Sequence, residues 1–310
     1  MYIYIIKRLL AMIPVLLGVS FIVFFLLGLA PGDAVSVMLG SGADPVAEAK
    51  LMHEFGLDRP LHIRYLDYIY NLFIKFDFGK SFRTRQPIVD EIVKRAPISL
   101  TISMSGIFFA ALIGVPLGVL SAVKQYSLLD TGTVVTALMF SAVPVFWLAM
   151  LLTYFLSLKA GWLPSYGLAS WKNYILPILS IVVIYSARIM RYSRSSMLEA
   201  IRQYYIRTAR AKGATENTVI FVHALKNAFL PIITVIGSLI GALIGGAIVI
   251  ENLFSIPGLG SVVVSGINTR DIPMVMGASI VIAAFYCTVL LLVDLFYAAI
   301  DPRIKARYLK

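Results

Sequence analysis

The tripeptide Gly79-Lys80-Ser81 could do chemistry, because Gly-Lys-Ser ends the loop that cradles nucleotide phosphates. That loop also needs a glycine five positions before Gly79, and Ile74 occupies this position. The surrounding sequence lacks the strand-to-helix context of such a loop, and the segment is expected on the external side, where there is no ATP pool. We therefore predict no nucleotide site in this chain.

Metal and catalytic chemistry are equally poorly supported. The three histidines, His53, His62 and His223, show no i, i+4 pairing, and the single cysteine, Cys287, lies inside an apolar run. No Ser/His or paired-Asp arrangement occurs within the apolar runs. We therefore expect no catalytic residue, no metal site and no cofactor bound by this chain.

The composition explains where these residues must be placed. Of 310 residues, 59% are hydrophobic and only 14% are charged, whereas an ordinary soluble domain is about 45–50% apolar and about 25% charged. The mean hydropathy is +0.87. Because the apolar residues come in long uninterrupted runs, they predict an integral membrane protein and exclude a soluble enzyme or a disordered chain.

Six charge-free apolar runs predict an all-α protein with six transmembrane helices. A bilayer core of about 30 Å needs about 20 helical residues, and only the fourth run is shorter, so it must recruit its neighbours between Trp171 and Met190. The first run ends without a signal-peptidase site and is interpreted as an uncleaved anchor. The runs are 9–29, 98–123, 131–158, 174–187, 228–250 and 272–293.

The distribution of positive charge predicts the orientation. With both termini in the cytoplasm, the internal connections carry fifteen Lys and Arg residues and the two short external ones carry three. The basic excess thus follows the positive-inside rule, and nucleic acid is not expected as a partner.

The long external segment 30–97 predicts three short helices outside the membrane. Asp44-Pro45 starts one that Gly56 ends, Pro60 starts a second with one apolar face, and Pro87 starts a third. These helices either pack onto the outer ends of the spans or receive a partner, and the sequence leaves both open.

The connection 188–227 predicts a basic helical protrusion on the cytoplasmic side. Its Ala- and Arg-rich stretch favours helix, Gly213 favours a sharp stop, and residues 214–218 can cap a second helix. Such a protrusion could fit a groove on a soluble subunit. Its key residues are predicted to be Arg207, Thr208, Ala209, Ala211, Lys212, Gly213 and Glu216.

This connection reads Arg-Thr-Ala-Arg-Ala-Lys-Gly at 207–213, followed by His-Ala-Leu-Lys-Asn-Ala at 223–228 and by Pro231. It resembles the coupling loop of ATP-binding-cassette importer permeases of the dipeptide and oligopeptide family. The general importer signature has Glu-Ala-Ala where this chain has Arg207-Thr208-Ala209. The peptide branch of the family shows this same departure from Glu-Ala-Ala. Further similarities run along nearly the whole chain, at 30–33, 56–58, 77–81, 144–147, 161–164, 245–251, 257–260 and 301–303.

The resemblance implies a type I ABC importer permease fold and a set of partners. Two homologous permease chains, expected here as a heterodimer, would form the pathway. Two cytoplasmic ATPases holding ATP and Mg²⁺ would drive it, and an external or periplasmic binding protein would deliver substrate. The implied domains are 1–97 (first span and external helices), 98–300 (the permease core) and the tail 301–310. The implied location is a bacterial or archaeal inner membrane.

Small residues in the fifth span predict close helix packing. Gly237, Gly241 and Gly245 recur at four-residue spacing with Gly246 beside them, and small residues let helix backbones meet in lipid. Packing within this chain and contact with a second permease at the pathway are both open. Because the spans carry no charge away from their ends, a neutral pathway wall is expected.

The substrate stays open at this level. Dipeptides or oligopeptides are expected, with nickel or a metallophore, glutathione and oligosaccharides as alternatives within the same architecture. An ATPase-independent secondary carrier is a remote alternative, since inverted repeats and ionisable groups near the midplane, common in such carriers, are not evident.

Overall fold

The computed structural model describes residues 2–40 and 44–300, and within them the chain is helical apart from turns and one isolated bridge between Lys80 and Pro87. The predicted all-α class is confirmed. The motif at 301–303 and the tail 301–310 lie outside the described residues. The chain divides into two compact units, with boundaries inside three of its long helices. Unit 1 contains the described residues up to Ser99 and Gly245–Cys287, and unit 2 contains Leu100–Ile244 and the described residues from Thr288.

Six spans are consistent with the described helices. Five segments are long and apolar enough to cross a bilayer, and a bent helix pair supplies the sixth. The five are Ile5–Leu29, Ile88–Val123, Trp171–Ile201, Thr218–Leu253 and Ile272–Phe296.

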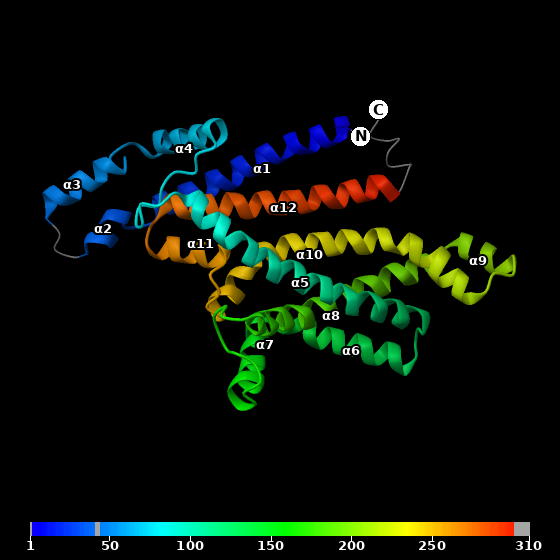
Figure 1. The fold of residues 1–310 in the computed structure, drawn as a ribbon. Helices are drawn as coiled ribbons and strands as arrows, with labels where there is room; N and C mark the ends of the chain where they lie inside the picture. Colours follow the sequence, from blue (N-terminus) through cyan, green and yellow to red (C-terminus); the bar gives the residue numbers. More distant parts are fainter. Residues whose placement is uncertain (1, 41–43, 301–310) are drawn as a thin grey trace. The chain divides into compact units, whose positions relative to one another are not determined.

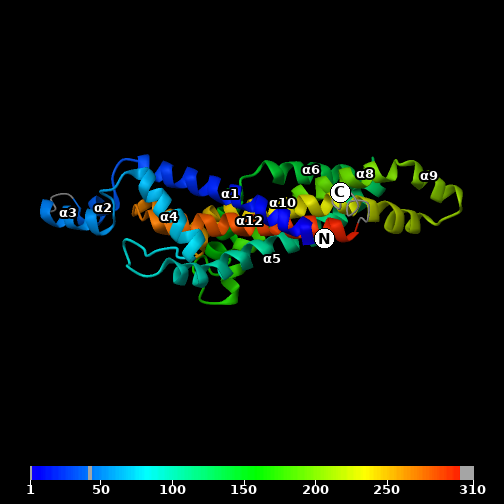
Figure 2. The same ribbon diagram turned by 90° about the horizontal axis from the view of Figure 1, so that it is seen from above.

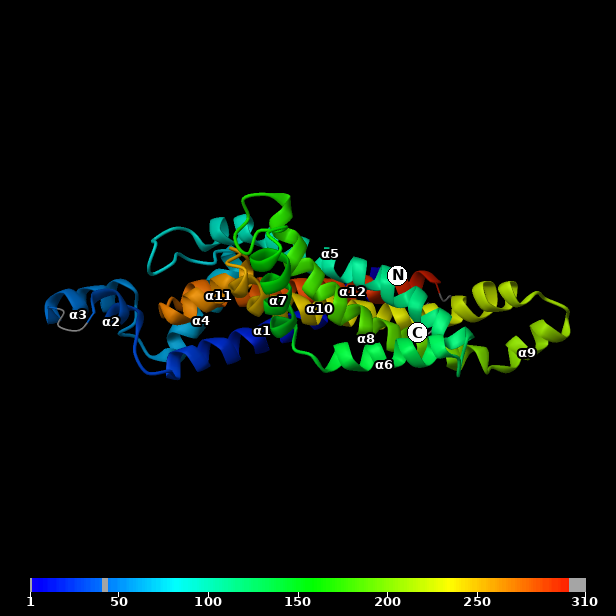
Figure 3. The same ribbon diagram turned by 90° about the horizontal axis from the view of Figure 1, so that it is seen from below.

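The third span is broken, whereas the sequence predicted one continuous run. Helix α6 (Leu128–Ala142) and the following helices α7 (Val145–Leu152) and η1 (Thr153–Lys159, π-helical) meet at an angle of 98° (Figure 3). Pro144 causes the break, because it lacks a backbone N–H and forces Val143 into extended geometry, at φ −81° and ψ 130°.

Unit 1 begins with α1 (Tyr2–Leu29) and continues through the external segment predicted from the sequence. The helix expected after Asp44-Pro45 is α3 (Pro45–Glu54), and the one after Pro60 is α4 (Leu61–Lys75). The Asp44 carboxylate accepts the Val46 N–H at 3.1 Å, as a helix cap should. A further short helix, α2 (Ala34–Leu39), was not predicted, although Asp33 caps it in the same way.

The prediction of a third, separate external helix after Pro87 is wrong. Pro87 does start a helix, but this helix is α5 (Ile88–Val123), which runs without a break into the second span (Figure 1). No glycine between Ile88 and Ser105 offers a stop. The first turns of α5 also bury Ile88 and Ile92 in the core of unit 1, which favours continuing the helix.

Helices α3 and α4 differ in how they are held. Helix α4 packs onto α1 (Figure 2). Its Leu72 is buried against Phe24 of α1, and its Tyr65 hydroxyl lies 3.1 Å from Ser20 Oγ. Helix α3 has no buried residue. Packing onto a span therefore accounts for α4, whereas α3 is held at its end by the ion pair between Glu54 and Arg85.

The core of unit 1 is completed by α11 (Leu259–Asn268) and the first part of α12 (Ile272–Ile300). Leu259, Val262, Val275 and Ala278 pack together with the start of α5. The core therefore joins segments far apart in the sequence.

Unit 2 is built on α8 (Ile175–Ile201), which follows the short helix η2 (Trp171–Tyr174). The fourth span is thus confirmed, and it extends past Ala187 to Ile201. Its backbone approaches α5 closely: a Cβ added at Gly114 would lie 2.6 Å from the Ser186 carbonyl oxygen. Only glycine fits at this crossing.

Three further helices of unit 2 come directly after α8 in the chain. They are α9 (Tyr204–Ala211), η3 (Thr218–Ala224, π-helical) and the long α10 (Leu225–Leu253), of which the part up to Ile244 belongs to this unit. The segment predicted as one connection, 188–227, therefore consists of the end of α8, a short helix and the beginning of the next span.

Candidate functional site: the helical hairpin between α8 and α10

Helix α9, the turn after it and the helical restart at Glu216 form a hairpin, defined here as residues 204–224. The turn is at Gly213, whose φ of +77° is the left-handed conformation that glycine adopts without strain. Its N–H donates to the Arg210 carbonyl at 2.9 Å, and the Ala214 N–H donates to the Ala209 carbonyl at 3.2 Å. The predicted helix, stop and restart are confirmed as local structure.

An ion pair closes the turn. Arg210 Nε donates to Glu216 Oε1 at 2.7 Å, and Arg210 Nη2 donates to Oε2 at 3.1 Å. These hydrogen bonds hold the pKa of the Glu216 carboxyl below its ordinary value. A two-pronged Arg–carboxylate pair fixes orientation as well as distance, so the two arms of the hairpin are held in one relative geometry.

The hairpin is anchored by an apolar cluster. Ile206 of α9, together with Val219 and Ala224 of η3, is fully buried against Ala122 of α5 and Met197 of α8. Burying side chains of this size removes apolar surface that water would otherwise contact. The hairpin therefore continues the packed core of unit 2 and is held at its base.

Most of the predicted coupling residues lie on the outer surface of this hairpin. Arg207 stacks over the Tyr204 ring at 5.6 Å, and Ala209 is half-buried at the edge of the apolar cluster. The exposed members are Arg207, Thr208, Ala211, Lys212, Gly213 and Glu216. The structure brings all seven predicted residues onto one short hairpin, with the three charged ones presented to solvent.

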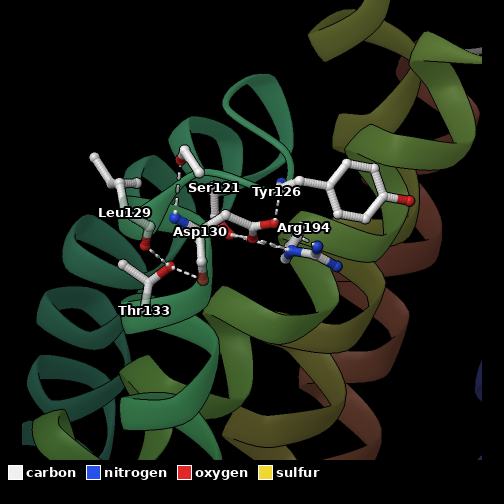
Figure 4. A network of polar contacts seen from close by, with 7 residues as sticks. Ser121, Tyr126, Leu129, Asp130, Thr133 and Arg194 are labelled. Atoms are coloured by element: carbon white, nitrogen blue, oxygen red, sulfur yellow. Dashed lines mark hydrogen bonds and ion pairs between the residues drawn. The ribbon is translucent and has the colours of Figure 1, made fainter.

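A second polar contact beneath the hairpin was not predicted from the sequence. Asp130, at the start of α6, accepts hydrogen bonds from Arg194 Nε at 2.7 Å, Arg194 Nη2 at 2.9 Å and Ser121 Oγ (Figure 4). The Tyr126 N–H donates to the same carboxylate at 2.9 Å. The one signal in the sequence was an acid beside an otherwise charge-free apolar run.

This contact shows that two connections lie at the same end of unit 2. The α5–α6 turn contains Tyr126, and the end of α8 that leads into the hairpin contains Arg194. The Asp130 side chain is only 5% exposed, and the Arg194 side chain is 24% exposed. The α5–α6 turn and the base of the hairpin are therefore joined by a largely buried ion pair.

The glycines of α10 divide into two groups. In unit 2, Gly237 and Gly241 are buried, and a Cβ at Gly237 would collide with the Val293 side chain. In unit 1, Gly245 and Gly246 are exposed, and no described atom lies within 4 Å of a Cβ added there. Packing within the chain accounts for Gly237, and the exposed pair has room for another molecule.

The Gly-Lys-Ser motif has a structural role in unit 1. Ser81 Oγ donates to Asp271 Oδ2 at 2.5 Å, and the Phe82 N–H donates to Oδ1 at 3.2 Å. The Asp77 carboxylate accepts the Gly79 N–H at 2.8 Å. The motif therefore shapes a turn around a buried carboxylate.

The motif at 257–260 is explained by a buried acid. Glu251, with no exposed surface, accepts hydrogen bonds from Ser99 Oγ at 2.6 Å and the Ser261 N–H at 3.0 Å. A Cβ at Gly258 would overlap the Glu251 carboxyl group. Glycine at 258 is thus required by the close approach of this side chain.

The described residues contain no group of three or more His, Cys, Asp and Glu side chains that could hold a metal ion. His53 instead lies beside Asp58, with its Nδ1 2.8 Å from Oδ2.

Comparison with known proteins matches nearly the whole chain to two family models. Residues 114–306 match the binding-protein-dependent transport system inner membrane component, and residues 1–105 match the N-terminal part of such membrane components. The chain belongs to this permease family. The resemblance inferred from the coupling-loop sequence is therefore confirmed.

Curated members of the permease family are similar over almost their full length. The glutathione transport system permease protein GsiC of Salmonella choleraesuis is 37% identical over 97% of this chain and 98% of its own length. The dipeptide transport system permease protein DppB of Alkalihalophilus pseudofirmus is 38% identical, covering 97% and 99%. The oligopeptide transport system permease protein AppB of Bacillus subtilis is 36% identical, also covering 97% and 99%.

Solved structures support the permease fold. An amino acid ABC transporter crystallised with histidines superposes with a TM-score of 0.54 at 14% identity, covering 67% of this chain and 93% of the other. The inward-facing MetNI methionine ABC transporter gives a TM-score of 0.54 at 22% identity, covering 71% and 98%. At these identities the likeness concerns the fold.

Proposed function

We propose that this chain is one of two membrane-spanning permease subunits of an ATP-driven, binding-protein-dependent importer, and that the 204–224 hairpin couples it to a cytoplasmic ATPase. The observation that carries the proposal is the construction of the hairpin. Its tip is basic and exposed, its turn is fixed by the Arg210–Glu216 pair, and its base is buried among apolar side chains. When a soluble subunit displaces the tip of such a hairpin, α8 and α10 at its base should move with it.

The proposed assembly contains a second, homologous permease, two ATPases and an external substrate-binding protein. ATP binding would close the ATPase pair and move the hairpins, so that the helices rock between inward-facing and outward-facing states. This chain would take no catalytic part and bind no cofactor, and ATP and Mg²⁺ would be held by the ATPase subunits. Exposed Gly245 and Gly246 would contact the second permease, and exposed α3 would contact the external binding protein.

The proposed orientation places both termini and the hairpin in the cytoplasm of a bacterial or archaeal cell. The excess of Lys and Arg in the connections on that side supports it. In this arrangement residues 1–97 carry the first span and the external helices, and residues 98–300 form the permease core.

The proposed substrate is a dipeptide or oligopeptide, supported by relatives named as dipeptide and oligopeptide permeases. Glutathione, itself a tripeptide with free carboxylates, is the second candidate, because a relative of equal similarity carries that name.

Reconstitution into liposomes tests the proposal. This chain would be co-expressed with a second permease, an ATPase and a binding protein of the same family of importers, and ATP-dependent uptake of labelled dipeptides and of glutathione would be measured. Uptake that stops with vanadate and requires the binding protein is expected. A chain that purifies without an ATPase and transports regardless of vanadate would instead be a self-contained carrier. Protease or cysteine labelling that finds the hairpin outside the cell would contradict the coupling role.

A further inference from the structure

Two arginines of α8 line a cavity within unit 2. Arg188 and Arg191 lie on one face of the helix with Tyr192 and Ser195, at the i, i+3, i+4 and i+7 spacing that places side chains together. Ser141 of α6 and Leu239 of α10 complete the lining. The cavity has a volume of about 530 Å³, within the range of small-molecule sites.

The arginines lie at a depth where the neighbouring span carries no charge. Arg188 is placed between Ser186 and Ile189, and both of these contact the position of Gly114 on α5. Gly114 lies nine residues inside the end of the charge-free run 98–123, which is about 14 Å along a helix. The neutral pathway wall expected from the sequence stays a prediction, and Arg188 and Arg191 are two charges on α8 that it did not include. The sequence placed Arg188 at the end of the fourth span and Arg191 in the connection that follows it.

Neither arginine has an acidic partner among the described residues. Arg194, about one turn beyond Arg191 on α8, is paired with Asp130, whereas the Arg188 guanidinium lies over the Tyr185 ring, 5.2 Å from its centre. Ionisable residues within membrane spans are costly, and most of those that occur face a protein interior or a water-filled path. An uncompensated pair of guanidinium groups is thus suited to an anion.

A further polar group lies at the same cavity without a partner. The buried Ser141 hydroxyl has no hydrogen-bond partner among the residues that the structure describes. It lies three residues before Pro144, where α6 breaks. Buried hydroxyls are usually hydrogen-bonded, so this one lacks a partner at the wall of the cavity.

From this arrangement we infer that Arg188, Arg191 and Ser141 form a binding site for a carboxylate of the transported substrate on its way across the membrane. The inference rests on the proposed function, in which the substrate is a peptide with a free C-terminal carboxylate. A guanidinium can bind both oxygens of a carboxylate, and Ser141 can donate one further hydrogen bond. The remaining lining residues, Tyr192, Ser195 and Leu239, place no further charge in the cavity.

The test uses the assembled transporter in liposomes. The double variant Arg188→Gln/Arg191→Gln removes both charges, and Arg188→Lys/Arg191→Lys keeps them. Lys172→Gln, at the other end of the same span, is the control. The uptake of a dipeptide would be compared with that of its C-terminal amide, each normalised to its occupancy on the binding protein. We expect the Gln variant to lower uptake of the free dipeptide about tenfold or more. Uptake of the amide, which has no carboxylate for the arginines to bind, should fall much less, and the Lys variant should recover part of the loss.

A second measurement detects occupancy directly. In a Cys287→Ala background, Ser195→Cys would place a thiol in the cavity, and free dipeptide should slow its alkylation in the otherwise unchanged chain but not in the Gln variant. Equal loss of both uptakes, no loss of either, or protection by anionic lipid without peptide would overturn the inference. Dissociation of the Gln complex alone would assign the arginines to a subunit contact and would also overturn it. If the unaltered complex moves no peptide, the proposed function fails first.

Discussion

Arg194 of α8 binds both oxygens of the Asp130 carboxylate at the start of α6, with N···O distances of 2.7 and 2.9 Å. Through this pair the α5–α6 turn is tied to the helix that leads directly into the hairpin. Movement of the hairpin should therefore reach α6 through α8.

Breaking this ion pair should destabilise the protein. Asp130→Asn or Arg194→Gln leaves the other partner largely buried without its counter-charge, and a loss of about 3 kcal/mol is expected. Unfolding of the purified protein in detergent measures it. Lys124→Gln, which removes an exposed charge from the same turn, is the control and should change little.

The double variant Asp130→Leu/Arg194→Met separates packing from charge. Replacing a buried pair by apolar side chains of similar size is often neutral, so most of the stability should return. If uptake stays low in this stable variant, the ion pair transmits movement as well as supporting the fold. A double variant as unstable as the singles would show that the geometry of the site, and not the unpaired charge, sets the cost.

Substitutions at Gly213 should follow backbone strain. A Cβ there meets no described atom within 4 Å, so size is not limiting, but the φ of +77° costs an Ala about 1–2 kcal/mol. We expect Gly213→Asn to couple ATP hydrolysis to uptake nearly normally, Gly213→Ala less well, and Gly213→Pro hardly at all, because proline requires φ near −65°.

Gly132→Ala is the matched control for this series, since Gly132 has similar open space and lies in a helix. The ratio of peptide taken up to ATP hydrolysed is the measurement. Normal coupling in Gly213→Pro would remove the hairpin from the mechanism.

The Arg210–Glu216 pair should make the hairpin sensitive to acid. The hydrogen bonds from Arg210 lower the pKa of Glu216 below its ordinary 4.5, so their contribution is complete above that pH and is lost as pH falls through the lowered pKa. Amide hydrogen exchange of residues 204–217 should accelerate on acidification, relative to the intrinsic rate at each pH.

The variant Glu216→Gln should already show this faster exchange at pH 7 and should lose its pH dependence. Glu199→Gln, an exposed acid on α8, serves as the control. Equal protection of the hairpin in the Glu216→Gln variant and in the unaltered chain at pH 7 would mean that the apolar base alone orders it.

Alanine should destabilise the chain at Gly258 but not at Gly246. At Gly258 the new Cβ collides with the buried Glu251 carboxyl group, and overpacking of this kind costs about 1–3 kcal/mol. At Gly246, inside α10, the space is open, and alanine favours helix by about 1 kcal/mol over glycine. Thermal unfolding of the isolated chain should fall for the first variant and be equal or higher for the second.

The same Gly246→Ala variant tests the proposed contact with a second permease. If that contact needs glycine, the variant should purify as a stable single chain but assemble poorly with its partner. Normal assembly and uptake would assign Gly246 to a lipid-facing position.

The sequence by itself determined the membrane class, the six apolar spans and the helix–turn–helix at Gly213. These features depend on hydropathy over about 20 residues or on the backbone preference of single residues, and both are local. It also carried the family resemblance, because the coupling-loop motif is contiguous.

The tertiary structure decided what depends on contact between distant segments. Asp130 and Arg194 are separated by 64 residues, and no local pattern pairs them. At Pro144 the continuous apolar run favoured one helix while the proline favoured a break. After Pro87 the sequence favoured a short external helix, whereas packing of Ile88 and Ile92 in the core favoured a helix that continues into the span. The α8 arginines form a candidate site because the helix extends to Ile201, which places Arg191 as well as Arg188 on the span, beside a cavity.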